Sequence, residues 1–260
     1  MKKAIVVASF GTTFPGIKVK ITDIIEKRYI KRFYDFHIYQ AYTSEMIIEQ
    51  IKIKKGIEIL NIPGILEKLS KSEYGHVFIQ PLHIIQGKEY EKIVDQVEIY
   101  KERFDTIKIG KPLLTDLSDF IDLKKILIKR VEGYKKGEGL VLMGHGSLNK
   151  EIMAYTYLDT ILKAEPIFIC TMESCPSIEM LIEKLHNCNI NKVNIAPLLL
   201  VSGKHVKKDM ISKEKYSLKS RLEDEEFIVD VNLKGLGEYD EIQEIYIQHT
   251  QRLLLENRSR

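Results

Sequence analysis

The sequence predicts an α/β fold of two similar lobes, each a parallel sheet flanked by helices. Short apolar runs alternate with longer amphipathic stretches along the whole chain. The first run, Ala4–Ala8, is continuously apolar, which is typical of a strand buried on both faces of a parallel sheet. The pattern then starts again in the second half of the chain. Strands that alternate with helices indicate parallel pairing through right-handed crossovers. We therefore expect an N-terminal lobe over residues 1–132 and a C-terminal lobe over residues 133–260.

In the first half, each apolar run is followed by a stretch with helical spacing. Ser44 stands where a helix N-cap is expected, because its hydroxyl can accept a hydrogen bond from the first turn. The expected strands are Ala4–Ala8, Phe36–Gln40, Val77–Leu82 and Thr106–Ile109, and the expected helices are Ile17–Ile30, Glu45–Ile53, Ile62–Leu69, Tyr90–Tyr100 and Phe120–Val131.

A polar, glycine-containing stretch over residues 133–139 is typical of a connection, and the strand–helix pattern resumes after it. The expected strands of the second half are Leu140–Met143, Ile167–Cys170, Val193–Leu200 and Phe227–Val231, and the expected helices are Lys150–Lys163, Ile178–Leu185, a helix starting over Lys204–Met210, and Glu241–Leu255.

The second half repeats the first. Val77–Glu89 aligns without a gap on Val193–His205, and the matching letters include a shared Pro-Leu and a shared Gly-Lys. Ser9–Thr12 also matches Gly144–Ser147, and Tyr42–Ser44 more loosely matches Met172–Ser174. Because the first two matches occur in the same order in both halves, they indicate a duplicated α/β lobe.

The repeat predicts a metal site in the second lobe. Ligands of open parallel sheets bind beyond the carboxyl ends of the strands. Three loops at that edge carry His145, Glu173 and His205, where the first lobe has Phe10, Thr43 and Glu89. Two imidazoles and one carboxylate can hold a divalent first-row metal and leave it exchangeable. Each residue also has an ordinary interpretation: a turn histidine, an exposed loop acid and a helix-flanking histidine, respectively.

Composition excludes several classes of protein. The 260 residues hold 40 Lys and Arg against 37 Asp and Glu, a net charge of +3, which is too small for a nucleic-acid-binding surface. No segment approaches the roughly 18 uninterrupted apolar residues of a membrane span, and the N-terminus is interpreted as a strand rather than a signal peptide. Three cysteines favour reduced thiols and a cytoplasmic protein. Neither Gly87-Lys88 nor Gly203-Lys204 is followed by the Ser or Thr of a P-loop.

Several segments together resemble one family. These are Val7–Thr12, Ala41–Ile48, Leu82–Ile93, Met143–Gly146 and Gly203–His205, and they resemble the anaerobic-pathway sirohydrochlorin cobaltochelatases, which are class II, ATP-independent tetrapyrrole chelatases. The resemblance covers nearly the whole chain in the same order. It implies two lobes with the tetrapyrrole held in a cleft between them.

The resemblance also implies roles for individual residues. Metal ligands would be His145, Glu173 and His205. His145 would double as a proton acceptor, and Glu89 matches an acid of the family's site. The positions expected to contact the substrate are Ser9, Phe10, Gly11, Thr12, His83, Gly87 and Lys88.

The expected reaction is ATP-independent insertion of Co²⁺ into sirohydrochlorin or precorrin-2, in anaerobic cobalamin biosynthesis. The expected partners are the tetrapyrrole and a divalent metal, with no further cofactor, no nucleic acid and no membrane; whether the chain forms a homo-oligomer is left open. Two alternatives stay open as well: an iron or nickel chelatase of the same fold, and a non-catalytic carrier of metal or tetrapyrrole.

Overall fold

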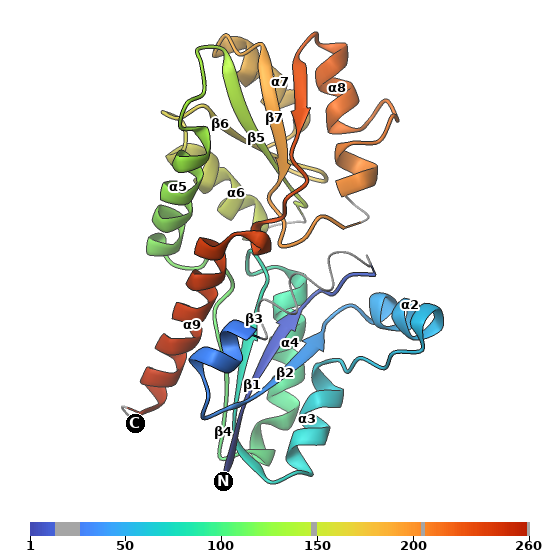
Figure 1. The fold of residues 1–260 in the computed structure, drawn as a ribbon, viewed down its shortest axis with the longest axis vertical. Coiled ribbons are helices and arrows are strands. Elements are labelled where there is room, and N and C mark those ends of the chain that lie inside the picture. Colours follow the sequence, from blue (N-terminus) through green and yellow to red (C-terminus); the bar gives the residue numbers. More distant parts are fainter. Residues whose placement is uncertain (14–26, 147–149, 204–205, 259–260) are drawn as a thin grey trace. The chain divides into compact units, whose positions relative to one another are not determined.

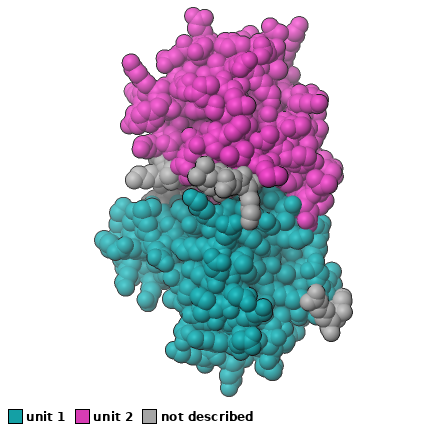
Figure 2. All heavy atoms as spheres, turned by 180° about the vertical axis from the view of Figure 1, so that it is seen from behind, with its two compact units in different colours: residues 1–115, 240–260 teal, residues 116–239 magenta. Residues whose placement is uncertain are grey.

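The computed structural model describes residues 1–13, 27–146, 150–203 and 206–258, and it divides into two compact units. Unit 1 is Met1–Thr115 together with Asp240–Arg260, and unit 2 is Asp116–Tyr239 (Figure 2). This division differs from the expected boundary between residues 132 and 133. The chain leaves unit 1 just before the helix α5 (Leu117–Val131) and returns to it with the helix α9 (Asp240–Arg258). Each unit is described separately, and the expected cleft between lobes stays a prediction.

Unit 1 is built on a four-stranded parallel sheet in the order β2-β1-β3-β4 (Figure 1). Its central strand β1 is apolar on both faces, as the continuous run at Ala4–Ala8 predicts. The strands are β1 (Lys2–Ser9), β2 (His37–Tyr42), β3 (Tyr74–Pro81) and β4 (Thr106–Ile109).

Helices cover both faces of this sheet. The helices of unit 1 are α2 (Glu45–Lys55), α3 (Ile62–Ser70), α4 (Lys88–Tyr100), followed by a short 3-10 turn over Lys101–Arg103, and α9 (Asp240–Arg258). On one face, Val6 and Ile79 pack with Leu66 of α3 and Ile93 of α4. α9 contacts β3, and its Thr250 hydroxyl donates a 3.0 Å hydrogen bond to the buried side chain of Gln80 on that strand. Residues 27–32 are also helical.

Unit 2 repeats this architecture with the strand order β6-β5-β7-β8, again all parallel. Its strands are β5 (Glu138–Gly144), β6 (Ile167–Thr171), β7 (Lys192–Pro197) and β8 (Ile228–Val231); its helices are α5 (Leu117–Val131), α6 (Lys150–Ile161), α7 (Ile178–Asn187), a π-helical turn (Val206–Met210), α8 (Leu218–Asp224) and a 3-10 turn (Leu236–Glu238). Val141 and Val193 pack with Leu181 of α7 and Leu222 of α8. The predicted fold class, two parallel sheets flanked by helices, is confirmed.

The backbone hydrogen bonds at the strand tips reproduce the internal repeat. The amide of Leu82 donates to the carbonyl of Ala8 at 2.7 Å, and the amide of Leu198 donates to the carbonyl of Met143 at 2.8 Å. These are equivalent positions in the ungapped alignment, so the two units share their loop geometry as well as their strand order. A second equivalent pair is Leu113 to His83 at 2.9 Å and Leu236 to Leu199 at 2.8 Å.

One part of the repeat has a different register from the one expected. Ser9 pairs with Tyr42, and its equivalent Gly144 pairs with Thr171. The counterpart of Thr43 is therefore Met172, one residue before Glu173. Three letters with only a serine in common could not fix this register, whereas the hydrogen-bonded ladder does.

Other expectations differ in detail from the structure. The helix expected over Ile17–Ile30 lies mostly outside the described residues, as does the start of the one expected at Lys204. The strand expected over Val193–Leu200 ends at Pro197, and α8 was not expected. Among the described residues, no helix has the length and apolarity needed to cross a membrane.

Candidate functional site: the carboxyl edges of the two sheets

The carboxyl edge of the unit 1 sheet brings together the expected substrate-contacting residues. β1 ends at Ser9, and exposed Phe10 and left-handed Gly11 (φ +91°) follow it. The amide of Thr43 donates to the carbonyl of Ser9 at 2.9 Å, which fixes the loop after β2 against the end of β1. The loop after β3 lies on the other side of β1, because β1 is paired with both strands.

Gly87 and Lys88 lie at the start of α4. Gly87 is the N-cap, and Lys88 is the exposed first residue of the helix. Glu89 follows in the first turn, where a carboxylate is favoured by the partial positive charge of the helix N-terminus. Thr12 lies in the described loop after Gly11. The structure thus places all seven expected contact positions, and Glu89, at or after the carboxyl ends of β1 and β3.

Buried polar atoms without a partner gather at this edge. Among the described residues, Thr43 Oγ1, Glu89 Oε2 and both ring nitrogens of His83 are buried and have no hydrogen-bond partner. An unpaired buried polar group costs about 1–3 kcal/mol. Burial lowers the pKa of His83 to about 4, so its imidazole is neutral at neutral pH. Such a concentration of unpaired groups is typical of an edge that meets a polar ligand.

Tyr246 of α9 holds the loop that carries His83. Its hydroxyl lies 3.0 Å from the carbonyl oxygen of Leu82 and 3.2 Å from that of His83, and it donates to them. Burial raises the pKa of this phenol well above its usual value, so it remains a donor. The sequence did not point to Tyr246, because an aromatic residue on the apolar face of a terminal helix has the pattern of an ordinary core residue.

The carboxyl edge of the unit 2 sheet holds His145 in a narrow backbone setting. A side chain at Gly144 would meet the ring of Tyr155 at 2.6 Å. Gly146 is left-handed (φ +71°), and a side chain there would overlap Thr171 and Ser174. Both glycines are therefore required by packing, and between them only His145 presents a side chain.

The loop after β6 brings Glu173 to His145. The amides of Met172 and Glu173 donate to the carbonyl of His145 at 3.1 and 3.2 Å. Glu173 Oε2 then lies 3.7 Å from His145 Nδ1, and both side chains are more than a third exposed. Two of the three expected metal ligands are thus neighbours at one strand edge, and both side chains are partly exposed.

The third expected ligand, His205, lies outside the described residues, as does Lys204. Within the described part of the chain, no group of three or more His, Cys, Asp or Glu side chains could hold a metal ion. The ligand set of His145, Glu173 and His205 therefore stays a prediction. The thiol of Cys175, two residues after Glu173, lies 3.7 Å from the sulfur of Met180 and not among the expected ligands.

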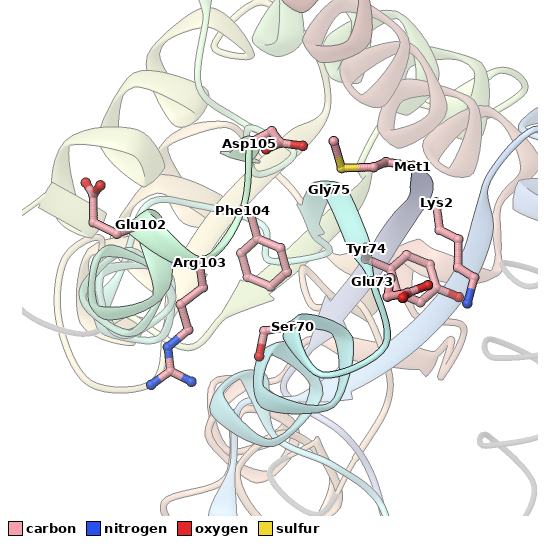
Figure 3. A pocket seen from close by; sticks show the side chains of 10 residues that line it. All are labelled: Met1, Lys2, Ser70, Glu73, Tyr74, Gly75, Glu102, Arg103, Phe104 and Asp105. Carbon is pink, nitrogen blue, oxygen red and sulfur yellow. The ribbon is translucent and has the colours of Figure 1, made fainter.

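A surface pocket lies at the opposite, amino edge of the unit 1 sheet (Figure 3). Lys2 begins β1 and Tyr74 begins β3, and both line it together with Glu73, Arg103 and Asp105. Arg103 is paired with Glu67 at 2.5 Å. Because ligands of parallel sheets bind at the carboxyl edge, this pocket is not the candidate site.

The fold is shared with solved structures of chelatases. SirB from Bacillus subtilis with Fe³⁺ has a TM-score of 0.64 at 15% identity, covering 96% of this chain and 95% of that one. The sirohydrochlorin chelatase SirB from Bacillus subtilis subspecies spizizenii, in complex with cobalt, has a TM-score of 0.60 at 13% identity, covering 96% and 94%. These likenesses show that the chain has the same fold as those two proteins.

The sequence comparisons then give the family. The family model described as "Cobalt chelatase (CbiK)" matches residues 3–254. The sirohydrochlorin cobaltochelatase of Salmonella typhimurium is 34% identical over 256 residues, which cover 98% of this chain and 97% of that protein. The chain belongs to the CbiK cobalt chelatase family, and the resemblance identified from its motifs is confirmed.

Proposed function

We propose that this chain inserts Co²⁺ into sirohydrochlorin on the route to cobalamin, without ATP. The observation that carries the proposal is the match to the cobaltochelatase of Salmonella typhimurium over 98% of the chain. The structure supports it with a solvent-open imidazole–carboxylate pair at one sheet edge and unpaired buried polar atoms at the other. Precorrin-2 is the alternative oxidation level of the tetrapyrrole substrate.

The residues of unit 2 would handle the metal. Co²⁺ is a substrate, so its site has to bind it and then release it to the macrocycle. His145 and Glu173 offer an imidazole nitrogen and a carboxylate oxygen, which suit a divalent first-row ion, and His205 would complete the set. Because both described side chains are partly exposed, the ion can arrive from solvent and leave again.

Metallation must also remove two protons. Four ring nitrogens bind Co²⁺ only after the two pyrrole N–H bonds have broken, so one macrocycle and one Co²⁺ give the metallated product and two protons. The imidazole of His145 accepts one proton, since imidazole is the side chain that most often serves as a general base. Glu89 is the acceptor for the other, because its buried Oε2 has no hydrogen-bond partner among the described residues.

The remaining expected residues would bind the macrocycle. Phe10 presents an exposed aromatic face at the end of β1, and Gly11 allows the chain to turn closely behind it. Lys88, exposed at the start of α4, would pair with a carboxylate of the substrate. Ser9, Thr12, His83 and Gly87 line the same edge.

Absorbance spectra of the purified protein with sirohydrochlorin and Co²⁺, without oxygen and ATP, test the proposal. We expect spectral conversion by the wild type and none by His145→Ala. His186→Ala is the matched control, because His186 also lies near a glutamate, with its Nε2 3.5 Å from Glu225 Oε2, but on α7 away from the strand edge. Binding without conversion in the wild type would make the chain a carrier and contradict the proposal.

Metal choice needs its own measurement. The chelatase fold occurs with Fe³⁺ and with cobalt in SirB, and a site of two histidines and one glutamate selects poorly by affinity alone. Initial rates with Co²⁺, Fe²⁺ and Ni²⁺ under the same anaerobic conditions would rank them. We expect Co²⁺ to be inserted fastest; a faster rate with iron would assign the chain to siroheme-type chemistry instead.

A further inference from the structure

His83 has a firmly held backbone and an imidazole that makes no hydrogen bond. Its carbonyl accepts from the amide of Leu113 at 2.9 Å and from the hydroxyl of Tyr246 at 3.2 Å. Among the described residues, neither Nδ1 nor Nε2 has a partner, although both are buried. The main chain of His83 is therefore held by its loop, while the polar atoms of its imidazole make no hydrogen bond in the folded state.

Unit 2 shows that the fold does not need an imidazole here. Its equivalent residue is Leu199, whose carbonyl accepts from the amide of Leu236 at 2.8 Å in the same way as that of His83 accepts from Leu113. Leu199 packs against the core of its unit. The same loop is thus built once with leucine and once with histidine, and only the histidine leaves buried polar atoms unpaired.

The surroundings of His83 decide what kind of atom it can meet. Leu82, Ile84 and Ile85 are all at most 8% exposed, so the neighbouring chain is apolar. A carboxylate from the rim of the substrate needs a cation, which the neutral imidazole does not supply; at this edge the exposed Lys88 at the start of α4 is a better partner for it. A flat ring with weakly polar N–H groups suits this environment better.

We propose that His83 accepts a hydrogen bond from a pyrrole N–H of the unmetallated macrocycle. The proposal rests on the proposed function, since it takes the substrate to be a tetrapyrrole. The neutral imidazole offers one lone pair for this bond. Because the ring nitrogens are covered in this structure, the segments around His83 must part when the macrocycle binds.

This bond would distinguish substrate from product. In cobalt sirohydrochlorin the two N–H protons have left and the nitrogens are bound to the metal, so the macrocycle has nothing to donate to His83. The residue therefore strengthens binding of the substrate and not of the product, which favours release after insertion. A residue that binds the rim carboxylates would strengthen the binding of substrate and of product equally.

The experiment compares His83→Leu, which installs the residue that unit 2 already uses, with His83→Gln, which keeps a hydrogen-bond acceptor. Equilibrium binding of sirohydrochlorin and of cobalt sirohydrochlorin is measured anaerobically without free metal. We expect His83→Leu to bind sirohydrochlorin about tenfold more weakly, as for one lost hydrogen bond in a buried site. Its affinity for cobalt sirohydrochlorin should be unchanged, and His83→Gln should recover part of the loss.

Ile84→Leu is the control, because it changes a buried neighbour that has no polar atom. Equal weakening of both ligands by His83→Leu would assign His83 to the carboxylates, and no weakening of either would remove it from the site; both overturn the proposal. A lower unfolding midpoint of ligand-free His83→Leu would also overturn it, since the imidazole would then support the fold. Failure of the proposed function shows separately, as no conversion of sirohydrochlorin by the wild type with Co²⁺.

Discussion

Replacing Gly146 by alanine tests whether the His145 loop is as tightly packed as the structure indicates. Gly146 has φ +71°, and its new Cβ would overlap Thr171 and lie 2.7 Å from Ser174 Oγ. A left-handed alanine costs about 1–2 kcal/mol, and forcing an atom into a packed site costs about 1–3 kcal/mol. We therefore expect Gly146→Ala to lower the free energy of unfolding by about 2–5 kcal/mol, a large share of the ~5–15 kcal/mol typical of proteins.

Gly133→Ala separates the two contributions. Gly133 is also left-handed (φ +87°), but among the described residues no atom lies within 4 Å of a side chain placed there. Gly133→Ala should therefore lower the free energy of unfolding by only the ~1–2 kcal/mol that a left-handed alanine costs. Denaturant unfolding of both variants measures the difference, which we attribute to the contact with Thr171 and Ser174.

Gly146→Ala should also weaken metal binding. The amide of Ser174 donates to Thr171 Oγ1 at 3.2 Å, so displacing Thr171 disturbs the loop that presents Glu173 to His145. A Co²⁺ titration should show weaker binding by Gly146→Ala and unchanged binding by Gly133→Ala. If the two variants unfolded at the same denaturant concentration and bound Co²⁺ equally, the packing argument would be refuted.

Two further outcomes are expected. Gln80→Leu should lower the free energy of unfolding, measured by denaturant unfolding, by about 2–4 kcal/mol. The side-chain amide of Gln80 donates to the carbonyls of Pro81 and Lys111 at 2.9 and 2.8 Å, and both carbonyls lose this donor in the variant. An unchanged free energy of unfolding would mean that water replaces the side-chain amide. His83 has a pKa of about 4 when folded, against about 6.5 when unfolded. As the pH falls, the unfolded chain therefore binds the additional proton before the folded chain does. Between pH 6.5 and pH 4 the free energy of unfolding of the wild type should fall by up to about 3 kcal/mol more than that of His83→Leu. If the free energies of unfolding of the two proteins changed in parallel with pH, this prediction would be wrong.

The sequence was sufficient to predict the two parallel sheets, but not where every strand ends. Continuous apolar runs such as Ala4–Ala8 identify buried parallel strands, whereas the strand expected over Val193–Leu200 ends at Pro197. Strand burial depends on the local pattern of apolar residues, whereas the end of a strand depends on where pairing with its neighbour stops, which for β7 is at Pro197 beside Met143. The proximity of His145 and Glu173 followed from the same reasoning, since adjacent parallel strands end at one edge.

The division into units could not be predicted in the same way. α5 has an apolar face that would fit either sheet, and only packing assigns it to α6, where Phe120 meets Tyr157 at a ring distance of 5.0 Å. α9 lies far from β3 in the sequence, and Thr250 finds Gln80 only in the folded chain. A glycine-rich connection at residues 133–139 suggested a boundary, but a flexible connection shows where the chain turns and not which surface its helices cover.

The two units share main-chain hydrogen bonds at their strand ends but carry different side chains there. The backbone bond from Leu82 to Ala8 has its equivalent from Leu198 to Met143, and the glycines that turn the chain after β1 and β5 are both left-handed. Because these bonds use only main-chain atoms, they form equally well with different side chains at the positions between the required glycines. Unit 1 therefore carries an aromatic ring after β1 where unit 2 carries His145, and an imidazole after β3 where unit 2 carries Leu199. The shared main-chain bonds therefore allow two copies of one fold to present different side chains at equivalent strand ends, as the proposed division of metal binding and macrocycle recognition between the two units requires.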